Sequence, residues 1–154
     1  MQSNSNAVRD FIDEVLNHGN IDATGRFFWE DMVEQVPFPG QGPGLDGLKD
    51  VLRGLRAAFP DMHWTIQEQI AEGDKVLSRF EWTGTHRGAF LGVPPTDRPV
   101  TVWGMVIDRF EGGKDQGHTA HHGHTGIDDA AGRDPAALGM TQCHPIRRST
   151  PAGV

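Results

Sequence analysis

The sequence has a single cysteine, no long hydrophobic run and fewer basic than acidic residues. Because Cys143 is alone, no internal disulfide can form, and a reducing cytoplasm suits the chain. Lysine and arginine number 14 against 21 aspartates and glutamates, a net charge of -7 that gives no basic surface for nucleic acid. No apolar run approaches membrane-spanning length, and residues 1–6 lack the basic and apolar regions of a signal peptide. These absences predict a cytoplasmic protein without nucleic-acid or membrane partners.

A chain of 154 residues is the size of one domain, and its first part is rich in helical patterns. Apolar residues recur at helical spacing over residues 8–16, which predicts an amphipathic helix. A second, shorter helical stretch is predicted around residues 21–29, leading into an edge strand over residues 33–37. A third helix is predicted over residues 48–59 and ends at a proline.

The middle of the chain is strand-like. Alternating patterns predict strands over residues 62–70 and 75–83, joined by a hairpin turn at residues 72–74, and a longer strand over residues 100–110. Helices that lead into such strands predict an α+β fold, in which a cone-shaped, curved antiparallel sheet packs on N-terminal helices and encloses a pocket. From residue 115 onward large apolar side chains are few and scattered, which predicts an irregular tail.

Three sequence blocks in the expected order carry a family resemblance. They are residues 58–61 (AFPD), 73–76 (GDKV) and 83–96 (TGTHRGAFLGVPPT). On these blocks, residues 5–114 resemble the SnoaL-like polyketide cyclase (ester cyclase) family, a branch of the ketosteroid-isomerase-like, or NTF2-like, fold. The resemblance implies a homodimer that needs no cofactor and binds a small hydrophobic molecule in a deep pocket. Family enzymes act on polyketides by acid–base chemistry, commonly an intramolecular aldol condensation.

The chain departs from the family after Lys114. The family continues with a last strand that carries an acid–base aspartate, then a short Leu-rich helix, whereas residues 115–126 read DQGHTAHHGHTG. A shifted reading frame permits a family-like ending, with the aspartate beneath the codons of Gly123 and His124. We therefore expect a SnoaL-like domain over residues 1–114 and an irregular, frame-shifted tail over residues 115–154.

Arg79 and Glu81 are the first catalytic candidates. They are two residues apart on one predicted strand, so both project from the same face. If that face lines the pocket, Glu81 becomes a candidate base whose pKa depends on burial and on the neighbouring guanidinium. A structural ion pair at the pocket wall, or on a solvated face, is the alternative. The spacing also resembles the Arg-x-Asp of limonene-epoxide hydrolases, which share the fold.

His86 matches the histidine of the family's Gly-Thr-His motif, and it is the third catalytic candidate. Its imidazole could orient a carbonyl or transfer a proton, but it could equally hold the adjoining loop through hydrogen bonds. On the longest strand, Gly104 and Val106 occupy positions that are polar in better-understood cyclases, and Asp108 lies on the same face. Trp103 lies on the opposite face and is expected outside the pocket.

Large rings and histidines complete the set of candidates. Phe28 and Trp29 could stack on a flat substrate, although such rings more often belong to the core or to a dimer contact. His118, His121, His122 and His124 resemble a metal-binding run, but the surrounding residues provide neither a scaffold nor supporting partners. We therefore predict no specific metal site.

The sequence thus predicts a SnoaL-like polyketide cyclase that acts on a hydrophobic cyclic or polyketide-type substrate without a cofactor. Loss of the last-strand aspartate would impair it. A limonene-epoxide-hydrolase-like hydrolase is one alternative. The other is a small-molecule binding domain without catalysis, which Gly104, Val106 and the missing aspartate favour.

Overall fold

The computed structural model describes residues 3–122, and its N-terminal part is helical. Helix α1 (Asn4–Phe11) begins where the Asn6 N–H donates to the Ser3 hydroxyl, and it continues into the π-helical η1 (Ile12–Asn17). A short 3-10 helix, η2 (Ile21–Arg26), follows. In the described part of the chain, no helix has the length and apolar character needed to cross a membrane.

The second long helix, α2 (Gly44–Ala58), buries one face and ends before the predicted proline. Its buried side chains include Leu48, Leu52 and Leu55, which recur at helical spacing. The helix packs against the strand β1 (Phe28–Glu34). That strand begins five residues earlier than the predicted edge strand. Phe28 and Met32 are buried along it, and they anchor the extended segment that the sequence analysis placed partly in a helix.

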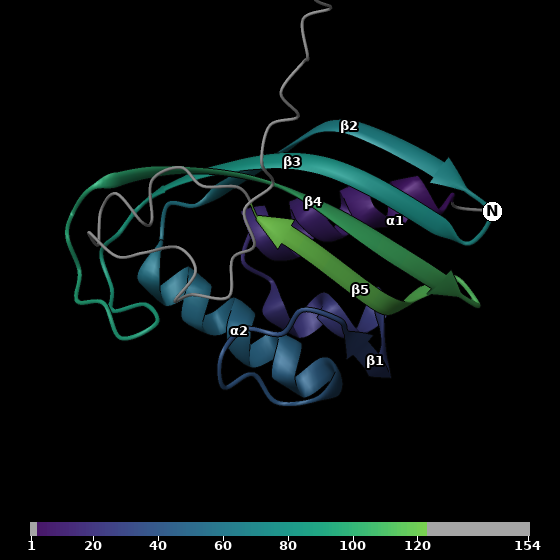
Figure 1. Ribbon diagram of the computed structural model, residues 1–154, viewed down its shortest axis with the longest axis horizontal. Helices are drawn as coiled ribbons and strands as arrows, with labels where there is room; N and C mark the ends of the chain where they lie inside the picture. Colours follow the sequence, from purple (N-terminus) through teal and green to yellow (C-terminus); the bar gives the residue numbers. More distant parts are fainter. Residues whose placement is uncertain (1–2, 123–154) are drawn as a thin grey trace, which may run out of the picture.

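Together with β1, four further strands form one five-stranded sheet of order β1-β5-β4-β3-β2. Strands β2 (His63–Glu72), β3 (Lys75–Thr85) and β4 (Pro99–Glu111) are antiparallel neighbours, as predicted. Strand β5 (Lys114–His122) is antiparallel to β4 and parallel to β1. Figure 1 shows the strands β2 to β5 curving over the helices, with α1 and α2 on the same side of the sheet. The predicted α+β architecture is confirmed.

The expected irregular segment is wrong for residues 115–122, because β5 occupies them. A tight turn at Gly112 and Gly113, both with positive φ, reverses the chain after β4. Backbone hydrogen bonds to β4 on one side and β1 on the other then hold β5, so the strand needs no apolar periodicity of its own. Residues 123–154 lie outside the described residues, and with them lies the position predicted for a hidden family aspartate. The domain division and the frame shift therefore stay predictions.

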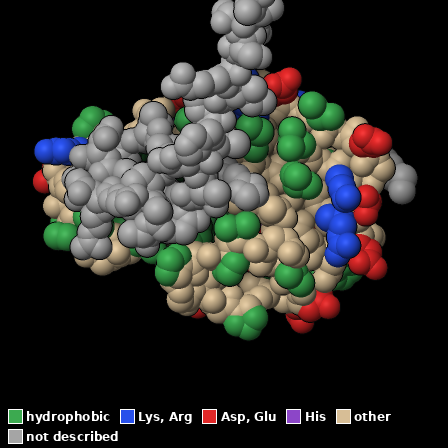
Figure 2. All heavy atoms as spheres, viewed as in Figure 1, with side chains coloured by type: hydrophobic (Ala, Val, Ile, Leu, Met, Phe, Trp, Pro, Cys, Tyr) green, Lys and Arg blue, Asp and Glu red, His purple; other side chains and the backbone are tan. Residues whose placement is uncertain are grey.

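The outer face of the sheet, which points away from the helices, carries a row of apolar side chains. Cross-strand pairing aligns Ile70 of β2 with Leu77 of β3 and Ile107 of β4. Ile70 and Ile107 are 57% and 40% exposed. In the view of Figure 2, a short band of hydrophobic side chains crosses the area of these strands beside a rim of charged side chains. This row is an exposed apolar strip on the outer face.

Candidate functional site

A cavity of about 150 Å³ lies between the inner face of the sheet and the helices. Its wall is built mainly from side chains that the apolar alternation of β3 and β4 and the helical spacing of α1 and α2 direct inward. The rings that line it are Phe11, Phe27, Phe28, Phe38, Trp64, Phe80, Trp82, Phe90 and Phe110. Four ionisable side chains also line it: Glu34, Asp108, Asp115 and His118. We refer to these four as the carboxylate–histidine cluster.

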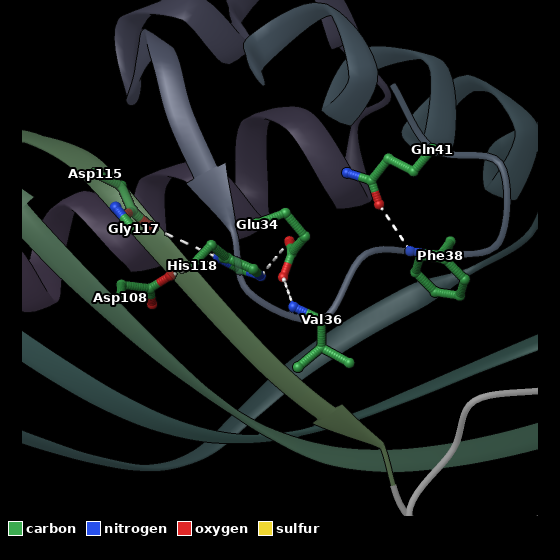
Figure 3. A network of polar contacts seen from close by, with 8 residues as sticks. All are labelled: Glu34, Val36, Phe38, Gln41, Asp108, Asp115, Gly117 and His118. Atoms are coloured by element: carbon green, nitrogen blue, oxygen red, sulfur yellow. Dashed lines mark hydrogen bonds and ion pairs between the residues drawn. The ribbon is translucent and has the colours of Figure 1, made fainter. Parts of the chain in front are cut away.

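Strand register brings the carboxylate–histidine cluster together. His118 of β5 pairs with Asp108 of β4 on one side and with Glu34 of β1 on the other. Asp115 lies three residues before His118 on β5 and reaches the same imidazole. Figure 3 shows His118 between Glu34 and the two aspartates, with Asp108 and Asp115 on the side away from Glu34. Three strands that are distant in sequence therefore supply one cluster.

The imidazole of His118 contacts all three carboxylates. Its Nδ1 lies 2.9 Å from Asp108 Oδ1 and 3.6 Å from Asp115 Oδ2, and its Nε2 lies 3.8 Å from Glu34 Oε2. The Gly117 N–H donates to Asp115 Oδ1, and the Val36 N–H donates to Glu34 Oε1. The other two aspartate oxygens, Oδ2 of Asp108 and Oδ2 of Asp115, are buried and have no hydrogen-bond partner among the described residues.

Burial and mutual repulsion change how these groups bind protons. Burial raises the pKa of Asp115 from 3.8 to about 7, opposed by the imidazole of His118 and helped by the like charge of Asp108. Burial also raises the pKa of Glu34 against the opposing charge of His118. Burial opposes a charged His118, but its contacts with Asp108 and Asp115 outweigh this, so the pKa of His118 lies well above 6.5. The cluster thus pairs a protonated imidazole with a carboxyl group that titrates near neutrality.

The expectation that Arg79 and Glu81 point into the cavity is wrong. Every second residue of β3 is buried, and these residues include Val76, Phe80 and Trp82. Arg79 and Glu81 lie at the positions between them and therefore project from the outer face. Arg79 donates to Gln67 at 2.8 Å and forms an ion pair with Glu68 at 3.5 Å, and its side chain is 45% exposed. The physical reason is the period of two along a strand, because only one of the two faces can pack against the helices.

On β4 the predicted orientation is found. Gly104, Val106 and Asp108 are buried on the inner face, and Trp103 lies on the outer face. Val106 and Asp108 line the cavity. Asp108 is 3% exposed, so it is a buried carboxylate and not the solvated charge typical of a hairpin end.

The two aromatic candidates at the start of β1 lie on opposite sides of the strand. Phe28 is 3% exposed and lines the cavity. Trp29 is 37% exposed, its indole N–H donates to the carbonyl of Glu111, and the ammonium of Lys114 lies over its ring. Trp29 is not among the described residues that line the cavity. Trp29 therefore contacts the β4–β5 turn outside this cavity, and its role in substrate binding stays a prediction.

His86 is buried beneath the loop that follows β3. Its backbone N–H donates to the Arg98 carbonyl, and its carbonyl accepts from the Asp97 N–H, both at 2.9 Å. Its ring contacts the Thr96 hydroxyl at 3.1 Å and stacks on Phe59. His86 is not one of the described cavity-lining residues. This geometry fits the alternative that the sequence analysis left open, in which the histidine holds the loop.

Sequence reasoning missed Glu34 and Asp115, and it considered His118 only within a histidine run. The signal that could have found them is the pair of glycines after β4, which predicts a hairpin and hence a returning strand opposite Asp108.

Asp108, Asp115 and His118 each offer one oxygen or nitrogen atom, and these three atoms lie within 4.8 Å of one another, a spacing that could hold a metal ion. Of the histidine run, β5 includes His121 and His122, and His124 lies outside the described residues.

Comparison with known proteins identifies a family model and solved structures that this chain resembles. A family model described as SnoaL-like polyketide cyclase matches residues 6–126. IdmH from Streptomyces antibioticus, a proposed polyketide cyclase, is 28% identical with a TM-score of 0.68, over 79% of this chain and 92% of that one. A proposed polyketide cyclase from Acidithiobacillus ferrooxidans is 26% identical with a TM-score of 0.69, over 90% of this chain and 96% of that one. No curated protein matches the sequence.

A protein that is less similar in sequence has a similar structure. TsrD from Streptomyces laurentii is similar with a TM-score of 0.70 at 22% identity, over 77% of this chain and 86% of that chain. At this identity the likeness concerns the fold alone.

Proposed function

The chain belongs to the SnoaL-like polyketide cyclase family, and from this premise we propose that it cyclises a small, hydrophobic polyketide-type substrate by acid–base chemistry that requires no cofactor. The observation that carries the proposal is the carboxylate–histidine cluster at one end of a cavity otherwise lined mainly by apolar side chains. Buried ionisable groups with displaced pKa values, placed in a cavity, are typical of catalytic sites. Asp115 on β5 offers a carboxyl group of the kind that the family resemblance led us to expect on the last strand.

We assign the base to Asp115 and the acid to His118. Asp115 Oδ2 is free of hydrogen bonds among the described residues, and a pKa of about 7 suits a group that removes a proton from carbon between two carbonyls. The resulting enolate carbon attacks a second carbonyl of the same molecule, and a carbon–carbon bond forms. The oxygen of that carbonyl receives a proton from the His118 imidazolium.

Proton return closes the cycle. After the product leaves, the proton on Asp115 passes to water and His118 takes one from water, so both groups regain their starting states and no net proton is lost or gained. Asp108 positions the imidazole through the 2.9 Å contact between its Oδ1 and His118 Nδ1. The reaction therefore needs neither an oxidant nor a metal ion to balance.

The two alternatives from the sequence draw less support from the geometry. The epoxide-hydrolase-like hydrolase relied on Arg79 and Glu81 at the pocket, and both project from the outer face. The binding domain without catalysis relied on an absence of acid–base groups in the pocket. The carboxylate–histidine cluster supplies such groups, so we favour the cyclase.

The experiment is a turnover assay on linear aromatic and aliphatic poly-β-ketones, with cyclised products detected by liquid chromatography and mass spectrometry. Asp115→Asn and His118→Asn should each lower kcat about 100-fold or more, the usual effect of losing a general acid or base. The matched control is Glu81→Gln on the outer face, which should retain wild-type kcat. Activity retained in Asp115→Asn, or absent from the wild type across the whole panel, would contradict the proposal.

We also propose that the protein is a homodimer joined through the outer face of its sheet. The row of Ile70, Leu77 and Ile107 offers an apolar strip that a second copy would cover by two-fold symmetry. Sedimentation equilibrium should give twice the monomer mass, and Ile107→Lys should shift the protein toward monomer. A monomeric wild type at micromolar concentration would refute the dimer. The cytoplasmic location stays a prediction from the sequence.

A further inference from the structure

The carboxylate–histidine cluster has an excess of negative charge that the chain does not balance. Three carboxyl groups, from Glu34, Asp108 and Asp115, face the single imidazole of His118. Among the described residues that line the cavity, none is a lysine or an arginine. The nearby ammonium of Lys114 donates to the Gly25 carbonyl and lies over Trp29, outside the cavity. A ligand that brings positive charge would therefore meet a complementary field.

The unsatisfied oxygens of the cluster point to the same class of ligand. Asp108 Oδ2 and Asp115 Oδ2 are buried acceptors without a hydrogen-bond partner among the described residues, and such oxygens are costly to bury. Their side chains are 5% and 3% exposed. A ligand with several N–H donors would satisfy Asp108 Oδ2, whereas a carbonyl or carboxylate group would add another acceptor beside it.

The rest of the cavity suits an organic cation rather than a bare ion. Aromatic rings surround the cluster, and Phe28 meets the His118 ring edge-on with centroids 6.0 Å apart. Ring faces attract alkylammonium groups, and apolar walls bind the body that carries them. A metal ion would use three of the cluster's ligand atoms but none of this wall, and it would have to displace the contact between Asp108 and His118 Nδ1.

We propose that the molecule bound in this cavity carries a protonated amine, which the carboxylates of Asp108 and Glu34 attract while Asp115 stays free to act as the base and the aromatic wall binds the apolar body of the ligand. The inference rests on the proposed function only in placing the reacting molecule in the cavity. It adds a substrate class to that function: an amine-bearing polyketide-type compound, in which the ammonium group fixes the orientation of the chain that cyclises.

The experiment compares three probes of nearly equal size: phenethylamine, 2-phenylethanol and phenylacetate. Isothermal titration calorimetry at pH 7.5, supported by quenching of the tryptophan fluorescence of Trp64 and Trp82, measures each Kd. The amine should bind at least tenfold more tightly than the alcohol, and phenylacetate should bind more weakly than both. Equal binding of the amine and the alcohol, or tighter binding of phenylacetate, would overturn the inference.

Two variants locate the effect. Glu34→Gln, whose side chain is only 12% exposed in the parent protein, should reduce the preference for the amine several-fold, and Glu81→Gln on the outer face should leave it unchanged. A melting curve and a circular dichroism spectrum confirm that each variant folds. An undiminished preference in Glu34→Gln combined with Asp108→Asn would place the amine elsewhere and overturn the inference.

Further measurements distinguish amine binding from metal binding, and they test the amine preference and the proposed function independently. Protein treated with EDTA should keep its amine preference, and a preference that appears only with added Zn²⁺ or Mn²⁺ would overturn the inference. Cyclisation of neutral poly-β-ketones without any amine preference refutes the amine and leaves the function standing. Amine preference without turnover of any poly-β-ketone refutes the function and leaves the binding site standing.

Discussion

Replacing Asp115 by asparagine should make the protein more stable at neutral and alkaline pH, although it removes the proposed base. The amide side chain of the variant keeps an oxygen that can accept from the Gly117 N–H, cannot ionise, and presents an NH2 donor in place of the oxygen near His118 Nδ1. In the wild type the folded pKa of Asp115 is raised from 3.8 to about 7, so between these pH values the folded state binds more protons than the unfolded state. Stability therefore falls as pH rises through this range, and the full penalty is present above pH 7.

The magnitude follows from that pKa difference. A displacement of this size corresponds to about 4 kcal/mol of unfolding free energy as an upper limit. The substitution also removes one of three carboxylate partners of His118, and this loss lowers the unfolding free energy and offsets part of the stabilisation. We expect a net stabilisation of about 2 kcal/mol above pH 7, or roughly 4–8 °C in Tm for a chain of this size. His118 adds a further loss of stability above its ordinary pKa in both proteins, since its folded pKa is raised.

The assay is a series of thermal melts of the wild type and Asp115→Asn from pH 4 to pH 8.5. The Tm difference should be near zero at pH 4, should grow as the pH rises and should level off above pH 7. Asp22→Asn is the control, because the Asp22 side chain is 95% exposed, and it should show no such trend. A variant less stable than the wild type at pH 8, or a Tm difference independent of pH, would refute the reasoning.

Further predictions concern residues outside the cavity. Arg79→Ala and Glu81→Gln should each change the unfolding free energy by less than about 1 kcal/mol and leave turnover unaltered, because the ion pair of Arg79 is exposed and Glu81 projects from the outer face; a large loss of kcat in either would restore them as catalytic residues. Gly47→Ala should destabilise the protein strongly, because the new Cβ would overlap the backbone carbonyl oxygen of Gly42. Gly54→Ala in the same helix has open space and should stabilise by about 0.5–1 kcal/mol, and urea denaturation of the two variants should show these opposite signs.

Much of the fold could be predicted because its apolar residues recur with clear periods. Residues 8–16 and 48–59 follow a helical period, and β3 and β4 alternate strictly. Alternation alone gives two faces and leaves open which one packs inward. On β3 the inward choice depends on the comparison of Phe80 and Trp82 with Arg79 and Glu81, and the larger apolar pair packs against the helices.

Strand β5 could not be predicted in this way because its inward positions are polar. Asp115 and His118 are held by partners on β4 and on β1, and β1 is far away in sequence, so the pair of glycines before the strand is the local signal and no apolar pattern adds to it. The carboxylate–histidine cluster also requires the printed reading frame as far as His118. Resequencing of the gene tests the cluster against the frame shift predicted from the sequence: the cluster requires an intact frame through His118, and a frame error near Lys114 would support the frame-shifted tail and remove the cluster.

The protonation state of His118 is the most direct test of the account, because a protonated imidazole held among three buried carboxyl groups is its central claim. Nitrogen-15 NMR of the imidazole rings, with His118 identified by the signals lost in His118→Asn, reports whether both ring nitrogens carry protons. We expect His118 to remain doubly protonated at pH 7.5, with a pKa well above 6.5. A neutral His118 at that pH, titrating at or below the ordinary value, would contradict it.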